Sequence, residues 1–145
     1  MVPDHNTEKI TAFLRKQNCT QDETVLTKLT SYLALLEKWN RVMNLTGLRT
    51  IDAILSDLVL DSFHLATFLS TLPLSDQGSA YDLGAGSGLP GIPLRLLWQQ
   101  GSYYLVERGA KRATFLRTVV SRLSLPQTFV LEQDVTTLLP EKKGK

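Results

Sequence analysis

A glycine-rich turn between a predicted strand and a predicted helix constrains the fold of this 145-residue chain more than any other feature. Residues 80–83 form a short strand-like run that leads directly into Gly84-Ala85-Gly86-Ser87-Gly88. Residues 90–99 are then predicted to form a helix with Pro90 in its first turn. Such a turn lets a ligand approach the backbone because no Cβ stands in the way, and the helix N-terminus offers free N–H groups. This segment predicts a site for a nucleotide-containing cofactor.

The same alternation of strand and helix continues along the chain. Residues 103–106 and 129–131 are predicted strands, and residues 111–123 between them form a predicted amphipathic helix. Strands that alternate with helices pair in parallel, with right-handed crossovers. The sequence therefore predicts an α/β fold with a Rossmann-like core of about three parallel strands.

Residues 1–72 carry a helical pattern, and we expect them to form an N-terminal extension. Helices are predicted over 8–16, from the capping box Thr20-Gln21-Asp22-Glu23 to Gly47, and after a cap at Asp52. The apolar stripes of the second and third helices are Val25, Leu26, Leu29, Leu33, Leu36, Val42 and Met43, and Ile54, Leu58, Leu65 and Phe68. Residues 73–145 are expected to form a partial cofactor-binding core that makes one structural unit with the extension.

Three parallel strands are half of a usual doubly wound sheet. Residues 134–145 contain no convincing fourth strand, so we expect an incomplete chain or a sheet completed by a partner. The strand at 80–83 would then keep an open edge that invites self-association. With a wall of the site missing, such a chain is expected to bind cofactor poorly and not to turn over.

Composition excludes several protein classes. Hydrophobic residues make up 43% and charged residues 21%, as in globular proteins. The net charge is +2, but residues 101–145 carry 8 basic and 4 acidic side chains. The single cysteine, Cys19, excludes an intramolecular disulfide and a cysteine-built zinc site. We expect no apolar run near the roughly 18 residues of a membrane span. The N-terminus lacks a signal-peptide pattern, which favours a cytoplasmic protein. We also expect no metal.

The glycine-rich turn fits two cofactor classes. Residues 86–91 match the dinucleotide fingerprint GxGxxG of NAD(P)-dependent oxidoreductases. The predicted strand ends at Leu83, however, so the fingerprint should begin at Gly84, and Leu89 then occupies its third glycine position. An acid beside the loop suits the ammonium and sulfonium of S-adenosylmethionine and would repel a pyrophosphate. The pattern therefore favours the register of S-adenosylmethionine-dependent methyltransferases, which consists of Asp82, Gly84, Gly86 and Gly88.

Two further acids follow the second and third predicted strands. Glu107 lies where a carboxylate can accept hydrogen bonds from both ribose hydroxyls of such a cofactor. Its structural alternative is a helix cap or a surface acid. Asp134 lies where adenine would sit, and its alternative is an ordinary residue that starts a loop.

Three segments of the chain resemble one enzyme family. They are Trp39-Asn40-Arg41-Val42-Met43-Asn44-Leu45-Thr46 before Leu60-Asp61-Ser62, residues 82–94, and Lys111-Arg112-Ala113-Thr114-Phe115-Leu116. Over roughly residues 20–137 the chain resembles the ribosomal small-subunit (16S) RNA guanine-N7 methyltransferases, also called glucose-inhibited division protein B. The Trp-Asn-x-x-x-Asn-Leu-Thr element and the Leu-Pro-Gly-Ile-Pro extension are not shared by methyltransferases generally. The resemblance implies a class I methyltransferase core, S-adenosylmethionine as cofactor and small-subunit ribosomal RNA as partner.

The resemblance also implies site residues. Gly84 and Leu89 would contact the cofactor from the loop, Val135 and Thr136 would contact it near adenine, and Glu107 would take the place of the acid after the second strand. The family continues with further strands and a Ser-Arg-Ala segment whose Arg lines the active site, and this half is absent here. An NAD(P)-dependent oxidoreductase fragment and a non-catalytic cofactor- or RNA-binding remnant are the alternatives.

Methylation at guanine N7 needs no general base, because N7 carries an in-plane lone pair and no proton. This fits a sequence without a Ser/His/Asp or Cys/His constellation, and His5 and His64 are expected to have surface or packing roles. No catalytic residue is assigned, and Asn40 and Asn44 are the candidates. Because they share one helix face at the helix end, they either cap the following turn or contribute to the mouth of the active site.

Basic residues that could contact RNA phosphates are Arg41, Arg49, Arg108, Lys111 and Arg112. Lys111 and Arg112, just beyond the cofactor acid, are the strongest candidates. For Arg117 and Arg122 we favour a solvated helix face. Trp39 and Tyr32 could stack on bases, but their spacing within an apolar stripe favours a place in the core.

Overall fold

The computed structural model describes residues 5–19, 21–47 and 50–138, and its sheet contains three parallel strands. The strands are β1 (Ser79–Leu83), β2 (Ser102–Val106) and β3 (Thr128–Leu131), in the order β1-β2-β3. The register places Asp82 opposite Leu105 and Leu105 opposite Val130. The predicted α/β class and parallel pairing are confirmed, and each strand begins one residue earlier than predicted.

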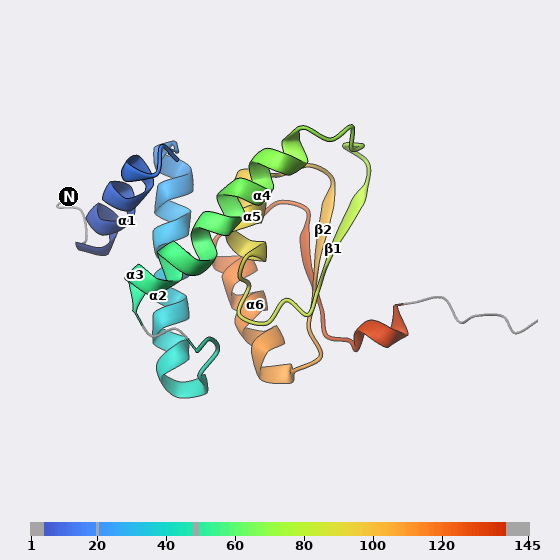
Figure 1. The fold of residues 1–145 in the computed structure, drawn as a ribbon. Helices are drawn as coiled ribbons and strands as arrows, with labels where there is room; N and C mark the ends of the chain where they lie inside the picture. Colours follow the sequence, from blue (N-terminus) through green and yellow to red (C-terminus); the bar gives the residue numbers. More distant parts are fainter. Residues whose placement is uncertain (1–4, 20, 48–49, 139–145) are drawn as a thin grey trace, which may run out of the picture.

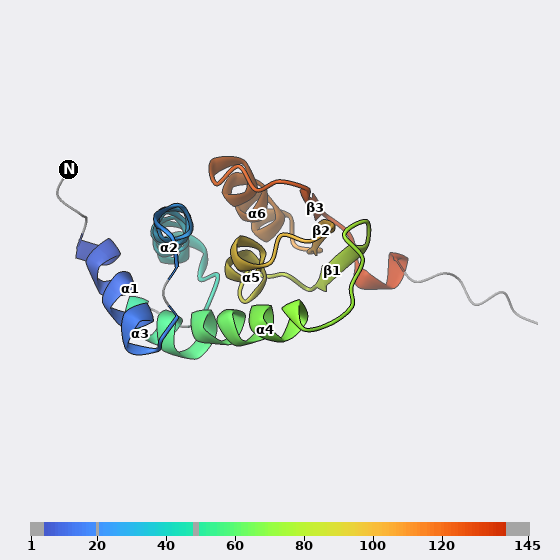
Figure 2. The same ribbon diagram turned by 90° about the horizontal axis from the view of Figure 1, so that it is seen from above.

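The α-helices that the structure describes lie on one side of the sheet (Figures 1 and 2). The crossover helices α5 (Gly91–Leu97) and α6 (Ala110–Arg122) follow β1 and β2. The helix α4 (Leu60–Ser70) packs beside α5, whereas α2 (Glu23–Met43) contacts both α5 and α6. The helix α1 (His5–Lys16) packs on α2, and α3 (Ile51–Ile54) continues through the π-helical turn η1 (Leu55–Val59) into α4.

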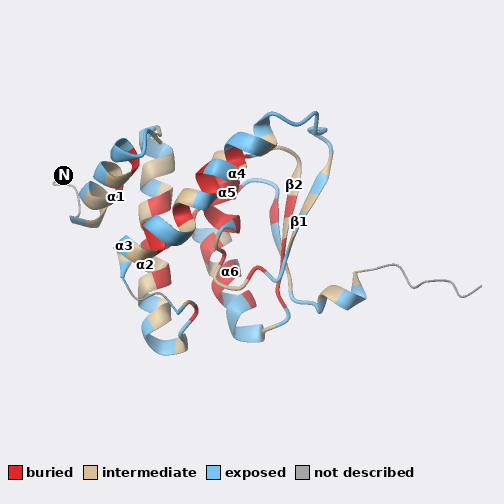
Figure 3. Cartoon of the chain, viewed as in Figure 1, coloured by how far each residue is buried: buried red, intermediate tan, exposed pale blue. Residues whose placement is uncertain are grey.

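The core lies between the sheet and these helices and continues among the helices themselves, as the buried residues in Figure 3 show. Leu105 of β2, Ile92 of α5, and Phe115 and Leu116 of α6 have no exposed surface. Burial of each such side chain contributes roughly 1.5–3 kcal/mol. The core therefore holds the helical extension and the strand–helix units together.

The predicted apolar stripes are confirmed in the middle of the helices and are wrong at their ends. Leu29, Leu33 and Leu36 of α2 are buried, but Val42 in its last turn is 86% exposed. Phe68, near the end of α4, is 57% exposed. An apolar period can continue to the end of a helix even where the packed neighbour no longer covers it.

Three predicted helix ends are corrected. The N-cap of α2 is Asp22, whose carboxylate accepts a hydrogen bond from the N–H three residues later at 2.9 Å; Thr20 lies outside the described residues. The cap before α3 is Thr50 rather than Asp52, whose carboxylate is paired with Lys9 at 2.8 Å. The helix α2 ends at Met43 because Asn44 adopts the left-handed conformation with φ 49°, so Gly47 is not its end. Asn tolerates this conformation better than most residues.

A buried guanidinium joins the turns that precede β2 and β3. Arg95 of α5 is 1% exposed, and its Nε donates to Thr128 Oγ1 at 3.0 Å. Its other nitrogens donate to the backbone carbonyls of Trp98, Gln100, Gly101, Pro126 and Gln127 at 2.7–3.4 Å. Burial lowers the pKa of Arg95, although an arginine remains charged in proteins. This one side chain orders both turns.

The opposite face of the sheet carries a row of stacked aromatic rings. Tyr81, Tyr104 and Phe129 lie in register on the three strands, with ring centroids 4.8 and 5.3 Å apart. Tyr81 is 52% and Phe129 45% exposed. None of the described helices covers this face (Figure 2).

One continuous helical run, Ile51–Ser70, is long and apolar enough to cross a membrane by length and composition. The expectation that no run approaches this length is therefore wrong. Such a run is weak evidence for a membrane span because core helices of soluble proteins have the same properties, and here Leu55, Val59 and Phe63 are buried in the core.

Candidate cofactor site

The glycine-rich loop begins where β1 ends. The N–H groups of Gly84 and Ala85 both donate to the carbonyl of Val106 at 2.9 Å, which fastens the start of the loop to the end of β2. Gly84, Gly86 and Gly88 all have positive φ, a conformation that side chains with a Cβ rarely adopt. The sequence therefore needs glycine at these three positions for the turn itself.

The three glycines differ in what surrounds them. A Cβ on Gly84 would meet nothing within 4 Å, so its backbone faces open space. A Cβ on Gly88 would lie 2.6 Å from Ile92 Cγ1 and 3.1 Å from Leu116 Cδ2. Gly84 leaves room for a ligand, whereas Gly88 lets the loop pack against the core.

Glu107 follows β2 and holds the loop from the side of the strand ends. Its carboxylate oxygens accept hydrogen bonds from the N–H groups of Gly86 and Gly109, each at 2.9 Å. Glu107 is 7% exposed, so the structure excludes the surface-acid alternative.

Asp134 lies before the 3₁₀ turn η2 (Val135–Thr137) and caps it. One carboxylate oxygen accepts from the backbone N–H of Thr136 at 3.0 Å and from its hydroxyl at 2.9 Å. These hydrogen bonds hold the pKa of Asp134 below its usual value. The other oxygen lies 3.8 Å from Arg108 Nη1. Asp134 therefore has the role that was the alternative to a cofactor contact, that of a residue that starts a loop.

The carboxyl ends of the three strands surround one cavity of about 280 Å³. Its lining combines four of the predicted cofactor residues with three neighbours; the lining residues are Gly84, Glu107, Asp134, Val135, Val106, Arg108 and Gln133. The other five predicted cofactor residues do not line it; they are Asp82, Gly86, Gly88, Leu89 and Thr136. The structure brings residues from three separate loops together where a parallel α/β sheet binds its ligands.

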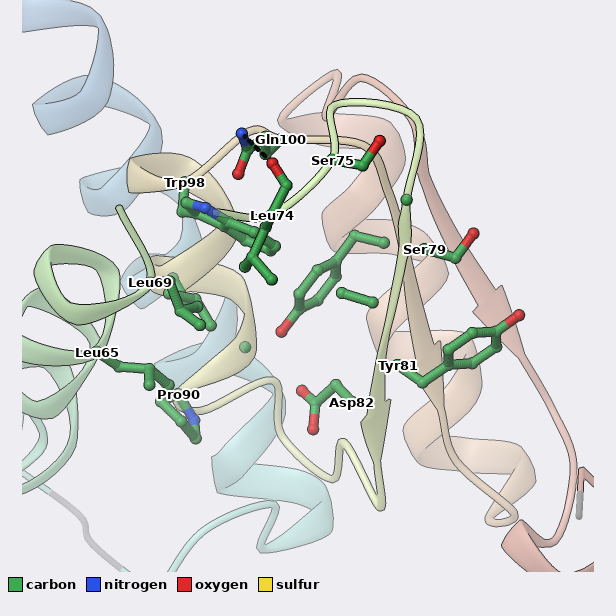
Figure 4. A pocket seen from close by; sticks show the side chains of 15 residues that line it. Leu65, Leu69, Leu74, Ser75, Ser79, Tyr81, Asp82, Pro90, Trp98 and Gln100 are labelled. Carbon is green, nitrogen blue, oxygen red and sulfur yellow. Dashed lines mark hydrogen bonds between the residues drawn. The ribbon is translucent and has the colours of Figure 1, made fainter. Parts of the chain in front are cut away.

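Asp82 lies on the other side of the loop. Its side chain points from β1 into a second cavity, of about 420 Å³, between β1 and the helices α4 and α5 (Figure 4). Burial raises the pKa of Asp82. Its Oδ2 atom and the Nε1 atom of Trp98 are both buried, and neither has a hydrogen-bond partner among the described residues. A Cβ on Gly91 would collide with this carboxylate, so Asp82 lies directly against the start of α5.

Asn40 and Asn44 line a third cavity, with Arg41 among its other lining residues. The Asn40 carboxamide accepts from the N–H of Thr46 at 2.9 Å, and Asn44 is the left-handed residue that ends α2. These contacts support the capping interpretation. A catalytic role for either residue stays a prediction.

The predicted RNA-binding residues are exposed, apart from Arg49, which lies outside the described residues. Arg41 pairs with Glu37 at 3.0 Å. Lys111 and Arg112, in the first turn of α6, border a concave surface with the end of α2, and within the described chain neither has an ion pair. The described residues contain no group of three or more His, Cys, Asp or Glu that could hold a metal ion.

The contact between Tyr32 and the loop was not predicted from the sequence. The Tyr32 hydroxyl donates to the carbonyl of Ser87 at 2.8 Å, across 55 residues of sequence. The apolar stripe indicated that Tyr32 is buried. No local pattern indicated what its hydroxyl would contact.

Parallel strands joined by helices, with an open glycine turn after β1 and a buried acid after β2, define a Rossmann-like α/β core of the cofactor-binding class. Comparison with known families then identifies the particular family. Residues 25–144 match the model of rRNA small subunit methyltransferase G, and the chain belongs to this family. The resemblance inferred from the three sequence segments is confirmed.

Individual relatives agree with this assignment. The ribosomal RNA small subunit methyltransferase G of Nitratidesulfovibrio vulgaris (strain DP4) is 45% identical over 135 residues, which cover 93% of this chain and 62% of that protein. The corresponding Lawsonia intracellularis protein is 48% identical over 120 residues, which cover 79% of this chain and 56% of that protein. The chain thus spans less than two thirds of the length of these relatives.

A solved structure shares the fold at low sequence identity. It is a Plasmodium falciparum chain described as a protein-L-isoaspartate O-methyltransferase, in complex with S-adenosyl-L-homocysteine. The TM-score is 0.55 at 15% identity, and the match covers 97% of this chain and 68% of that one. This likeness supports the Rossmann-like methyltransferase fold.

Proposed function

We propose that the chain forms the cofactor-binding part of an S-adenosylmethionine-dependent methyltransferase that acts on guanine N7 in small-subunit ribosomal RNA. The observation that carries the proposal is the convergence of Gly84, Glu107, Asp134 and Val135 on one cavity at the strand ends. Membership of the rRNA small subunit methyltransferase G family supports the reaction. Ribosomal subunits lie in the cytoplasm, so we place the protein there.

The residues around this cavity fit the cofactor. The backbone at Gly84 is open to a ligand. Each Glu107 oxygen accepts one N–H, and a carboxylate oxygen can accept a second hydrogen bond, so capacity remains for ribose hydroxyls. Leu89 and Thr136 are proposed contacts on the basis of the family resemblance. Asp82 is half-buried and Gly88 is buried, and these positions favour support of the loop from behind.

The cofactor would supply an electrophilic methyl group on a sulfonium. Guanine N7 presents a lone pair and needs no proton removed, so the protein has to bind and align two reactants and exclude water. The division into residues 1–72 and 73–145 is part of this proposal, in which the second segment supplies the cofactor loop and the first packs beside it.

Titration calorimetry tests the cofactor class. We expect S-adenosylhomocysteine to bind the chain and NAD to give no heat, because the Glu107 carboxylate lies against the loop at the N–H of Gly86, where it would repel a pyrophosphate. A response to NAD with none to either methionine-derived ligand would favour the oxidoreductase alternative. Binding of none of these ligands would contradict a cofactor-binding role for this chain.

We propose that Lys111 and Arg112 contact phosphates of the ribosomal RNA. Both are exposed beside the cofactor site. Replacing both with Ala is expected to weaken RNA binding and to flatten its log–log salt dependence by about 1–2 units. Filter binding over a range of salt concentrations measures this slope, with Arg117→Ala/Arg122→Ala as the matched control on the same helix. An unchanged slope would assign Lys111 and Arg112 to a solvated helix face.

We also propose self-association through the edge of β1 and the aromatic row formed by Tyr81, Tyr104 and Phe129. Among the described residues β1 is an edge strand, and exposed rings lie beside that edge; such surfaces favour association. A sedimentation coefficient that rises with protein concentration would support this, whereas a constant monomer value would contradict it.

A further inference from the structure

Tyr32 connects the N-terminal helical segment to the glycine-rich loop. It lies in the middle of α2, has no exposed surface, and donates its hydroxyl hydrogen to the Ser87 carbonyl at 2.8 Å. The same oxygen would lie 3.4 Å from a Cβ on Gly88. The hydroxyl therefore contacts the loop just before α5 begins.

The peptide unit between Ser87 and Gly88 is held at both of its polar groups. Its carbonyl accepts from Tyr32, and its N–H donates to the carbonyl of Ala85 at 2.8 Å. Because a peptide unit is planar, two such contacts determine its orientation. One residue earlier, the N–H of Gly86 is held by Glu107 at 2.9 Å. Two successive parts of the loop are thus held by two different elements, α2 and the end of β2.

We propose that Tyr32 is a positioning residue, which keeps the glycine-rich loop in its cofactor-binding conformation without touching the cofactor. The inference rests on the proposed cofactor-binding function. Tyr32 does not line the cavity at the strand ends, so its influence passes through Ser87 and Gly88. It gives the N-terminal segment a direct part in cofactor affinity.

The glycines make this contact necessary. Gly84, Gly86 and Gly88 give the loop many accessible backbone conformations, and a loop without fixed contacts must lose that freedom when a ligand binds. A buried hydroxyl that donates to the loop orders it before the ligand binds and so reduces the conformational entropy that is lost on binding. Burial raises the pKa of Tyr32 well above its usual value, so the hydroxyl keeps its proton and remains a donor at neutral pH.

The test compares Tyr32→Phe with Tyr103→Phe in the full chain. Each change removes one hydroxyl from a buried ring, but Tyr103 lies on β2 and borders the cavity between β1 and the helices α4 and α5. We expect Tyr32→Phe to raise the dissociation constant for S-adenosylhomocysteine by about three- to tenfold, and Tyr103→Phe to change it less than twofold. Amide hydrogen exchange without ligand should become faster over residues 84–88 in Tyr32→Phe and remain unchanged there in Tyr103→Phe.

The outcomes separate this inference from the function on which it rests. An unchanged affinity of Tyr32→Phe, alongside binding by the unaltered chain, would overturn the inference and leave Tyr32 as a core residue. Faster exchange throughout the core, rather than in the loop, would overturn it as well. Failure of the unaltered chain to bind would overturn the proposed function and, with it, the role in cofactor binding; the exchange measurement would then still decide whether Tyr32 holds the loop.

Discussion

An Arg95→Met variant is expected to be less stable than the unaltered chain by about 3–5 kcal/mol. Methionine fills similar space but removes every donor, so the carbonyls of Trp98, Gln100 and Gly101 lose the donor that Arg95 supplies. The Pro126 carbonyl keeps the Thr128 hydroxyl as a donor, and the Gln127 carbonyl keeps the N–H of Tyr103. Each buried acceptor without a donor costs about 1–3 kcal/mol, and those near the surface recover part of this from water. The loss is a large fraction of the total stability of a domain.

Urea denaturation followed by circular dichroism measures this loss. Arg117→Met is the matched control, because Arg117 is exposed and its one ion pair among the described residues is with Glu132 at 3.4 Å. The control should shift the unfolding free energy by less than about 1 kcal/mol. Arg95→Lys should fall between the two, since an ammonium keeps the charge but has three donors in place of five. Equal stability of Arg95→Met and Arg117→Met would show that the turns before β2 and β3 do not depend on Arg95.

The sequence was sufficient to predict the strand–helix units because their signals are local. The glycine turn after residues 80–83 follows from residue types within a few positions, as does the amphipathic period of 111–123. Parallel pairing then brings the ends of β1, β2 and β3 to one edge. The order of the elements along the chain is therefore enough to expect Glu107 and Asp134 near Gly84.

The remaining features depend on contacts between distant segments, and residue type alone does not reveal them. The helix α2 ends at Met43 rather than at Gly47, because the next residue, Asn44, adopts the left-handed conformation although it is not glycine. Asp82 has the residue type expected for a ligand contact, but the strand's alternation turns its side chain toward α4 and α5. Arg95 offered no signal of burial, since a lone arginine in a helix is usually a surface residue.

A Glu107→Ala variant is expected to bind S-adenosylhomocysteine on the order of 2–3 kcal/mol more weakly, which is roughly a 30- to 150-fold higher dissociation constant. The change removes the acceptor proposed for both ribose hydroxyls. It also releases the N–H groups of Gly86 and Gly109, so the loop loses one of the side chains that hold it. Calorimetric titration measures the dissociation constant, and Glu132→Ala, an exposed acid on the following strand's end, is the control.

A second substitution separates loop support from ligand contact. Glu107→Gln keeps one acceptor oxygen but places an NH₂ group against either Gly86 or Gly109, where two donors then face each other. If Glu107 acts only by holding the loop, the affinity of each variant should fall in step with its unfolding free energy measured without ligand. If it also binds the ribose, the affinity should fall further than the stability does. An unchanged dissociation constant in Glu107→Ala would show that Glu107 does not bind the cofactor. The other described acid that lines the cavity is Asp134, whose carboxylate already caps η2.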